Sequence, residues 1–331
     1  MDKIPLYPLR FEPLYQYRPW GGRRLGSLLS TPLPGHEPIG EAWVLSDRQG
    51  HASVVANGLL KGRTLGHLLE QAPEHLLGKL AAYYTRFPLL LKFLDVRKTL
   101  SVQVHPSDAY KELIPVGDTG KTEAWVVLEK GSEARIFAGL KSETTADVLR
   151  QAINNGTVAD QVASFAPQVG DGVFIRAGTV HSLRDVVVFE VQENSDVTFR
   201  LYDWNNIDPK TSQRRPLQVD QAMACINFKQ GVIGPVIPQV NRAKSRPWER
   251  LINCDHFGVW RINSEFPFVA GAAGACRVLV GIGGRGELEH AGINYPFSEG
   301  DVLLLPASVG ECHCQPNGTV TLLEISLPEI R

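Results

Sequence analysis

Residues 100–106 combine residue types and a spacing that can hold a metal ion. On a strand, residues two positions apart point to the same face, so Gln103 and His105 can present an amide oxygen and an imidazole to one point. Glu123 begins another apolar run, and His181 follows a turn further along the chain. One amide, two imidazoles and one carboxylate suit Zn²⁺ and leave a coordination position open for water or substrate.

Each of these residues has a simpler explanation when taken alone. A single His on a strand is more often part of the core, a single Gln is usually at the surface, and a Glu can protect a strand end. Only their joint occurrence predicts a metal site. Cys312, His313 and Cys314 lack further ligands nearby, so we expect buried structural thiols there. We expect six further histidines at the surface: His36, His51, His67, His75, His256 and His290.

The elements that must position these groups are mostly strands. Short β-branched or aromatic runs separated by Gly, Pro and Asp are typical of antiparallel sandwiches and barrels. Apolar spacing predicts a helix over 64–77, whose regularity Pro73 limits, and another over 145–154. A short third helix is expected over 158–165. The last two would form a small helical insertion at about 140–166.

A turn–strand–turn pattern occurs twice in the chain, at 170–183 and at 300–310. Both copies resemble the second conserved motif of cupins, which are small double-stranded β-helix jelly rolls. We therefore expect an all-β protein with minor helices, built from two cupin domains. The predicted division is a catalytic domain at 1–229, a linker at 230–246 and a C-terminal domain at 247–331. The second copy lacks a counterpart of His181, so we expect it to be free of metal.

Composition excludes several classes of protein. The chain has 331 residues, which leaves room for two domains, and 43% of them are hydrophobic and 21% charged. Its 34 Lys and Arg against 35 Asp and Glu give a net charge of −1, so no overall positive field attracts nucleic acid. No apolar run approaches the ~18 residues of a membrane span, and no export signal is evident. We expect a cytoplasmic protein with five reduced thiols.

Several segments together resemble the type I mannose-6-phosphate isomerases, and they occur in that family's order. They are residues 19–22, 40–43, 88–95, 100–106, 120–125, 177–181 and 195–203. The resemblance implies interconversion of mannose 6-phosphate and fructose 6-phosphate by proton transfer between C2 and C1 through an enediolate. It also implies one Zn²⁺ per chain. Such an ion can stabilise the negative charge that builds on oxygen when a proton leaves the carbon beside a carbonyl.

The same resemblance implies a role for each candidate residue. The metal ligands would be Gln103, His105, Glu123 and His181. Arg200 matches the family's catalytic arginine. Lys92, Lys121 and Glu190 match polar positions of its pocket, and Ser101 matches a phosphate contact. Near the ion the pKa of Lys121 would fall, so that either Lys121 or Glu190 could carry the proton.

Two positions leave alternatives open. Arg200 could instead form a strand-end salt bridge with Asp203 or Asp196. The family commonly has Lys or Arg shortly after the Tyr-Asp pair, whereas this chain has Asn206, which puts the phosphate contact in doubt. Arg214 and Arg215 in the next loop could compensate.

Three alternatives to the phosphosugar isomerase stay open at this level. The isomerase is favoured over a metal-dependent cupin oxygenase, because oxygen chemistry favours a His-rich iron site and Gln103 argues against one. A non-catalytic sugar-binding cupin would not require Arg200, Lys121 and four ligands together. An isomerase of an unphosphorylated aldose is the third alternative. A small phosphosugar is the expected partner, with no membrane and no obligate protein partner, and the chain is expected to be a monomer.

Overall fold

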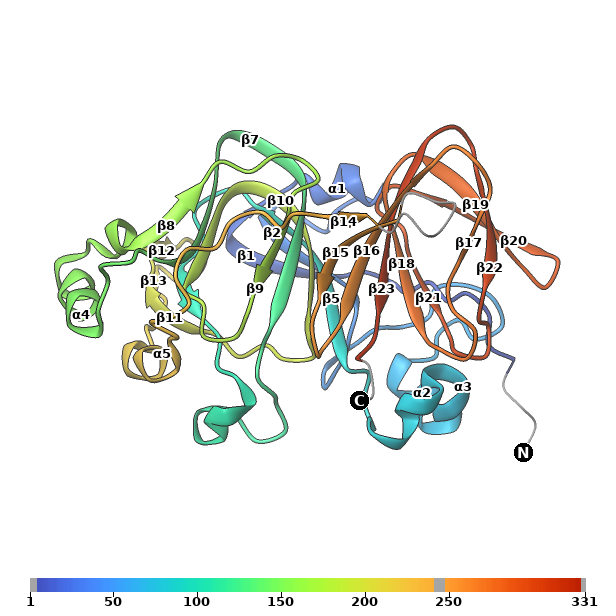
Figure 1. Cartoon of the computed structure of the whole chain (residues 1–331), viewed down its shortest axis with the longest axis horizontal. Coiled ribbons are helices and arrows are strands. Elements are labelled where there is room, and N and C mark those ends of the chain that lie inside the picture. Colours follow the sequence, from blue (N-terminus) through green and yellow to red (C-terminus); the bar gives the residue numbers. More distant parts are fainter. Residues whose placement is uncertain (1–4, 241–247, 329–331) are drawn as a thin grey trace.

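The structure is a computed structural model that describes residues 5–240 and 248–328. Within these residues most elements are strands, and they form curled sheets that lie side by side (Figure 1). The expectation of an all-β protein with minor helices is confirmed. Residues 1–4 of the first predicted domain and residues 247 and 329–331 of the second lie outside the described residues. Residues 241–246 of the predicted linker do so too.

The larger curled sheet carries the residues of interest and is called the first barrel. Its strands are β1 (Leu14–Gly22), β2 (Ile39–Leu45), β5 (Leu89–Val96), β6 (Val102–Val104), β7 (Glu123–Leu140), β8 (Val162–Phe165), β9 (Gly172–Ile175), β10 (His181–Glu193) and β11 (Phe199–Tyr202). They follow the order β1-β2-β5-β10-β6-β11, and β7 pairs with β8, β9 and β10. All pairings are antiparallel, so each strand alternates between an inner and an outer face.

Two further sheets form the second barrel. The first contains β14 (Gln239–Val240), β15 (Trp248–Asn253), β16 (Gly258–Ser264), β23 (Val320–Ser326), β18 (Arg277–Gly283) and β21 (Val302–Leu305). The second contains β17 (Phe268–Ala270), β22 (Cys312–Pro316), β19 (Arg285–His290) and β20 (Ile293–Ser298). Two short hairpins complete the strands: β3 (Asp47–Arg48) with β4 (His51–Ala52), and β12 (Ile207–Asp208) with β13 (Gln213–Arg214).

The helices are short and lie outside the barrels (Figure 1). They are α1 (Leu25–Leu28), α2 (Leu65–Gln71), α3 (Pro73–Leu77), α4 (Ala146–Asn155) and α5 (Val219–Cys225), with 3₁₀ turns at Lys79–Ala82, Asp108–Leu113 and Val158–Gln161. The α4 prediction is confirmed, with Thr145 accepting a hydrogen bond from Val148 N as its N-cap. None of these helices is long and apolar enough to cross a membrane.

Two helix predictions need correction. The helix expected over 64–77 is two helices, because Pro73 begins α3 and cannot continue the hydrogen bonding of α2. The helix expected over 158–165 is a 3₁₀ turn followed by β8, which pairs with β7. The insertion at 140–166 is therefore not wholly helical. Its β-branched and aromatic residues gain more from pairing with the neighbouring strand than from a short helix.

The predicted repeat is present in the hydrogen bonding of the two barrels. Asp171 accepts a hydrogen bond from Gln168 N, and Asp301 accepts one from Ser298 N, each at 2.8 Å. The glycine before each aspartate has a positive φ, 91° and 87°, which only glycine adopts without strain. The two copies therefore share one turn structure.

The strands of the first barrel place apolar and charged residues on one inner face. Leu94 and Val96 of β5 pack in the same buried cluster as Trp125 of β7 and Val188 of β10. Lys92 lies on the same face of β5 as Leu94, two residues earlier. One end of the interior is therefore apolar, and charged groups occupy the other.

A bulge in β10 brings an odd-numbered and an even-numbered residue to the same interior. The register of β10 against β7 shifts between Arg184 and Val186, and Asp185 between them has a φ of 48°. His181, before the shift, and Glu190, after it, can thus both face inward. The carboxylate of Asp185 accepts a hydrogen bond from Arg97 at 2.7 Å, which stabilises the bulge.

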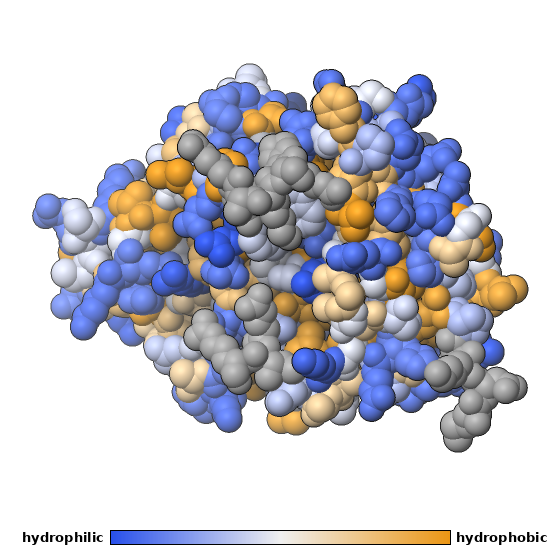
Figure 2. Space-filling view, turned by 45° about the vertical axis from the view of Figure 1, so that its right-hand side comes forward, coloured by the Kyte–Doolittle hydropathy of each residue, from blue (hydrophilic) through white to orange (hydrophobic). Residues whose placement is uncertain are grey.

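The two barrels share a core. One buried cluster contains Phe93 and Phe189 of the first barrel together with Val278 and Ile325 of the second. The N-terminal segment also joins them, because Leu9 exchanges backbone hydrogen bonds with Leu304 of β21 at 2.9 and 2.8 Å. On the face shown in Figure 2, hydrophobic residues occur in small groups among hydrophilic ones. The domain division at 230–246 stays a prediction.

Candidate active site

The side chains of His105, Glu123 and His181 meet inside the first barrel. All three are buried, and their candidate ligand atoms lie within 4.8 Å of one another. Nε2 of His105 lies 3.4 Å from Oε2 of Glu123, and Nε2 of His181 lies 3.3 Å from Oε1. Glu123 begins β7, His181 begins β10, and His105 directly follows β6. Three strand ends thus converge on one point, and we call these residues the His–Glu–His group.

A turn helps to hold the two imidazoles in place. Gly178 has a φ of 84°, which suits glycine, and its N–H donates to the backbone oxygen of His105 at 2.8 Å. This contact joins the turn before His181 to the residue that follows β6.

The hydrogen bonds of the two imidazoles turn each Nε2 toward Glu123. Nδ1 of His105 lies 2.7 Å from the carbonyl oxygen of Val197, and Nδ1 of His181 lies 2.9 Å from that of Thr179. Because a carbonyl only accepts, each Nδ1 carries the proton and each Nε2 keeps a lone pair. Both Nε2 atoms lie near the carboxylate of Glu123, but among the described residues only that of His105 is without a hydrogen bond, because Nε2 of His181 also lies 3.2 Å from Nε2 of Gln103.

These facing acceptors fit a divalent metal ion. Nε2 of His105 and both carboxylate oxygens of Glu123 are buried and make no hydrogen bond of good geometry. Buried acceptors that face one another without a proton are costly. A cation bound between them removes that cost, and two imidazoles with one carboxylate are a donor set that suits Zn²⁺.

The protonation states also fit metal binding. Burial and the positive charge of Lys121 lower the pKa of His105 to about 3, and burial lowers the pKa of His181. Burial alone would raise the pKa of Glu123, but Lys121 and the two histidines hold it well below the ordinary value. At neutral pH the group therefore presents neutral imidazoles and a carboxylate, the forms that bind metals.

Gln103 lies beside the His–Glu–His group. It pairs in register with His181 of β10 and with Arg200 of β11. Its Nε2 lies 3.2 Å from Nε2 of His181, and its Oε1 accepts a hydrogen bond from Ser101 Oγ at 3.2 Å. A 180° rotation of the amide would turn Oε1 toward His181 and let the Ser101 hydroxyl accept from Nε2. The structure thus brings all four expected ligands together, with the Gln103 oxygen turned away.

Lys92, Lys121 and Glu190 are buried next to the group. Lys121 Nζ lies 3.0 Å from Oε2 of Glu123, and Lys92 Nζ lies 3.6 Å from Oε1 of Glu190. The other oxygen of Glu190 accepts a hydrogen bond from Trp125 Nε1 at 2.8 Å. These contacts place two cations and a carboxylate within reach of one small ligand.

The pKa values of Glu190 and Lys121 are both raised, for different reasons. Burial and the negative charge of Glu123 raise the pKa of Glu190. Burial alone would lower the pKa of Lys121, but Glu123, Glu190 and Asp196 raise it. The expected lowering for Lys121 is therefore reversed in the chain itself, because its neighbours are carboxylates.

A cavity of about 480 Å³ opens beside these groups, and Lys92, Gln103, Lys121, Glu190 and Arg200 help to line it. Among the described residues Arg200 has no carboxylate within 4.0 Å, and its Nε is buried without a hydrogen bond.

The expected alternative for Arg200, a salt bridge with Asp203 or Asp196, is wrong. Asp203 pairs with Arg215, and Asp196 lies 3.6 Å from Lys92. The Arg200 guanidinium is therefore available to a ligand.

Sequence reasoning missed Arg18 and Glu41, which also line the cavity. Glu41 accepts hydrogen bonds from Arg18 at 2.8 and 3.0 Å and from Trp43 Nε1 at 2.7 Å. Burial alone would raise its pKa, but Lys92 and Arg18 lower it to about 2. A signal was present in the sequence, because a charged residue interrupts the apolar strand β2.

The two arginines of the loop after β11, Arg214 and Arg215, differ in their position relative to the cavity. Arg215 lines the cavity, whereas Arg214 is exposed and does not. Asn206 lies in a turn in which its N–H donates to the carbonyl of Asp203, and it does not line the cavity either.

His256 is not a simple surface residue. Its Nδ1 lies 3.1 Å from Oε1 of Glu193, at the end of β10. Glu193 is buried, accepts a hydrogen bond from Thr122 N at 2.6 Å, and has its pKa raised to about 7 by burial. This pair joins the two barrels near the strands that carry the site.

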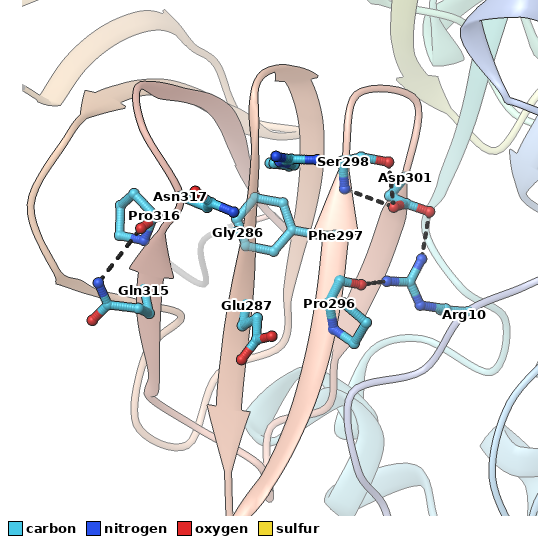
Figure 3. Close-up of a pocket in the computed structure, with 11 residues that line it drawn as sticks. Arg10, Gly286, Glu287, Pro296, Phe297, Ser298, Asp301, Gln315, Pro316 and Asn317 are labelled. Atoms are coloured by element: carbon cyan, nitrogen blue, oxygen red, sulfur yellow. Dashed lines mark hydrogen bonds and ion pairs between the residues drawn. The ribbon is translucent and has the colours of Figure 1, made fainter.

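A larger cavity of about 820 Å³ lies on the second barrel (Figure 3). Arg10 reaches it from the N-terminal segment and pairs with Asp301 and the carbonyl of Pro296, and the ring of Phe297 lies beside Gly286. Across residues 5–240 and 248–328, no group of three His, Cys, Asp or Glu other than the His–Glu–His group could hold a metal ion.

The two cysteines next to His313 behave as structural thiols in the structure. Cys312 and Cys314 are free and buried, and burial raises the pKa of each thiol to about 12. Thiols that stay protonated at neutral pH are poor metal ligands.

Comparison with known proteins identifies close relatives. Residues 9–122 match the family described as "Phosphomannose isomerase type I, catalytic domain". The chain is 34% identical over 310 residues to mannose-6-phosphate isomerase ManA of Bacillus subtilis, covering 92% of this chain and 94% of that protein. It is 30% identical over 306 residues to mannose-6-phosphate isomerase of Streptococcus mutans, covering 91% and 93%.

The fold agrees with these matches. The crystal structure of the mannose 6-phosphate isomerase from Bacillus subtilis superimposes with a TM-score of 0.88 at 28% identity, covering 97% of this chain and 99% of that chain. The expected cupin fold is thereby confirmed. Relatives that match over nearly their whole length at 30% identity or more place this chain in the type I phosphomannose isomerase family.

Proposed function

We propose that this enzyme interconverts mannose 6-phosphate and fructose 6-phosphate by moving a proton between C2 and C1 through an enediolate. The observation that carries the proposal is the buried His–Glu–His group, which combines unsatisfied acceptors with a polar cavity. The relatives that are named mannose-6-phosphate isomerases support the choice of substrate.

The proposed metal ligands are His105, Glu123 and His181, with Gln103 as the fourth after its amide rotates. A bound Zn²⁺, one per chain, would act as a Lewis acid for the oxygens at C1 and C2 of the sugar. Only Glu123 among these ligands is anionic, so the site would keep a net positive charge. That charge favours a substrate on which negative charge develops.

Glu190 is the proposed base. Its carboxylate is buried, lines the cavity and is oriented by Trp125. A raised pKa brings a carboxylate closer to neutral pH, where it can both accept a proton from one carbon and return it to the next. Lys92, 3.6 Å away, would stabilise the charged form. Lys121 is the other candidate, and its raised pKa favours a positively charged role instead.

Arg200 is proposed to stabilise the oxyanion of the enediolate. Its guanidinium stays charged at every working pH and has no carboxylate partner in the described chain. Donors that are already in place when charge develops lower the barrier, because the site needs no rearrangement at that moment. Ser101 donates to Gln103 Oε1 in the structure and would accept from Nε2 once the amide has rotated, so it would hold the amide rather than contact phosphate directly.

The test is an assay of mannose 6-phosphate conversion on protein first stripped of metal and then given Zn²⁺, with free mannose run in parallel. We expect no turnover without metal and rapid turnover of the phosphosugar after its return. Equal use of mannose would move the substrate to unphosphorylated aldoses. A full equivalent of bound zinc without turnover of either sugar would favour a sugar-binding protein and contradict the proposal.

A further inference from the structure

Two arginines reach the cavity from segments that contribute nothing to the His–Glu–His group. Arg18 lies on β1, and Arg215 directly follows β13. Their side chains are 30% and 17% exposed, so each is partly withdrawn from water. The pair is separated by nearly two hundred residues of sequence, and the fold brings both to one opening.

A carboxylate orients each guanidinium through two hydrogen bonds. Nε and Nη2 of Arg18 donate to Glu41 at 2.8 and 3.0 Å. Nε of Arg215 donates to Asp203 at 2.8 Å, and its Nη2 donates to the other oxygen of the same carboxylate. Both carboxylates are buried. Bidentate pairing fixes the plane of a guanidinium, so both groups are oriented before any ligand arrives.

Together with Arg200, these two residues form the arginine cluster of the cavity, and some of its N–H donors have no partner in the described part of the chain. Within the described residues Nη1 of Arg215 donates to no protein atom, and Nε of Arg200 is buried without a partner. Nη1 of Arg18 donates to the carbonyl of Tyr17 at 3.2 Å, which an incoming anion can replace. Free N–H groups that point into a cavity favour a ligand rich in acceptor oxygens.

The cations of this cluster repel one another. Burial lowers the pKa of Arg200, and the positive charges of Arg215 and Arg18 lower it further. Like charges held in one cavity favour a ligand that carries more than one negative charge. Asp208 also lines the cavity and is half-buried, and its Oδ1 accepts a hydrogen bond from Tyr17 at 2.9 Å.

We propose that Arg18 and Arg215 form the subsite for the terminal phosphate of the substrate, with Glu41 and Asp203 as the residues that position them. The inference rests on the proposed function, and it names the residues by which that site would select a phosphorylated sugar. A phosphate dianion accepts charge-assisted hydrogen bonds from guanidinium groups, which carry several N–H donors in one plane.

The decisive variant is Arg215→Ala, and the chain offers a matched control. Arg214→Ala removes the same charge from the neighbouring position, which is exposed and does not line the cavity. For Arg215→Ala we expect kcat/KM with mannose 6-phosphate to fall roughly 10- to 100-fold, mainly through KM, because one charge-assisted contact is lost. Arg214→Ala should match the wild type. Equal values for the two variants would overturn the inference.

Two further variants separate binding from a loss of structure. Arg215→Lys keeps the charge but loses the bidentate geometry, so we expect partial recovery of KM. Asp203→Asn releases Arg215 from its anchor and should raise KM while Arg215 itself is intact. Thermal unfolding of each variant shows whether the fold is retained. If Arg215→Lys and Arg215→Ala have the same KM as the wild type in folded protein, Arg215 does not bind phosphate.

Binding of inorganic phosphate, measured by calorimetry, distinguishes this inference from the proposed function. Wild type and Arg214→Ala should bind phosphate, and Arg215→Ala should bind it roughly 10-fold or more weakly. This result without turnover of mannose 6-phosphate would support the subsite and contradict the function. Normal turnover and unchanged phosphate binding in Arg215→Ala would support the function and contradict the subsite.

Discussion

The two barrels share a turn structure but differ in what fills them. In the first barrel His105, Glu123, His181 and Glu190 occupy one end of the interior. In the second, a buried cluster of apolar residues that includes Leu288 and the two buried cysteines of β22 fills the interior. At the same sequence distance from the shared turn, the first copy has His181 and the second has Glu311, which is exposed.

This difference separates what the fold requires from what the chemistry requires. A barrel of this kind folds around an apolar interior, so the buried charges of the first barrel are not needed to form it. Buried ionisable groups cost free energy even when paired, and active sites are where proteins retain them. The proposed function therefore depends on a few inward-facing positions of one barrel, while the other contributes to the shared core.

The largest effect is expected from Glu123→Gln in the first barrel. The only anionic ligand of the proposed metal would become neutral, so we expect metal binding and turnover to be lost, with a fall in kcat of about a thousandfold or more. Metal content and kcat are measured on the same preparation. His313→Ala, which removes an exposed histidine of the second barrel, should retain both. Loss of metal in the His313 variant would contradict the contrast between the barrels.

Arg200→Ala should lower kcat with metal and fold retained. Removal of one preorganised donor to an oxyanion typically costs roughly 10²–10³ in kcat. Arg200→Lys keeps the charge but not the geometry, and it should recover only part of that loss. Steady-state kinetics and metal analysis check the prediction. Turnover equal to the wild type in Arg200→Ala would remove Arg200 from the reaction.

Glu190→Gln tests the proposed base. The substitution keeps the hydrogen bond from Trp125 but cannot accept a proton, so we expect kcat to fall roughly 10²–10⁴-fold while metal is retained. Lys121→Met is the comparison. If Lys121→Met lost turnover and Glu190→Gln did not, the proton would be carried by Lys121.

A substitution in the second barrel should act on stability alone. Leu288 is fully buried, and Leu288→Ala is expected to lower the free energy of unfolding by about 3 kcal/mol through the cavity it creates. The kcat of the folded protein should not change. Denaturant unfolding and kinetics below the transition are the measurements. A large fall in kcat for folded protein would show that the second barrel takes part in the chemistry.

The smallest effect concerns pH and the contact between the barrels. Burial raises the pKa of Glu193 from 4.5 to about 7 in the folded chain. The protonated carboxyl therefore stabilises the fold below pH 4.5, and this contribution is lost as the pH rises through about 7. The Glu193→Gln side chain cannot ionise and so does not lose this contribution. As the pH rises from 4.5 to about 7, the free energy of unfolding of the variant should therefore increase relative to that of the wild type by roughly 1–3 kcal/mol. Unfolding is measured against pH for both proteins, and parallel curves would contradict the prediction.

The sequence was sufficient for the strand-borne parts of the site. Spacing by two predicted that Gln103 and His105, and Lys121 and Glu123, lie close together, although His105 follows β6 and Lys121 precedes β7. His181 and Glu190 were expected at the site from the turn pattern and the resemblance, but spacing could not show their common interior, which depends on the bulge at Asp185. No local sequence pattern indicates where a bulge shifts the alternation of side chains between the two faces of a strand.

Long-range pairing was also beyond the sequence. The partner of Asp203 is Arg215 rather than Arg200, and only the folded loop decides between them. The strand at 162–165 was missed because its pairing partner lies in β7, more than twenty residues away. Glu41 could have been noticed, since a charge inside an apolar strand must have a partner.

The most direct test of the central claim is the activity of the enzyme as a function of bound metal. Metal-free protein is titrated with Zn²⁺, and bound zinc and the rate of mannose 6-phosphate isomerisation are measured at each step. If one site in the first barrel carries the reaction, the rate rises in proportion to bound zinc and stops rising at one ion per chain. Full activity in metal-free protein, or a rate that requires a second ion, would contradict the account.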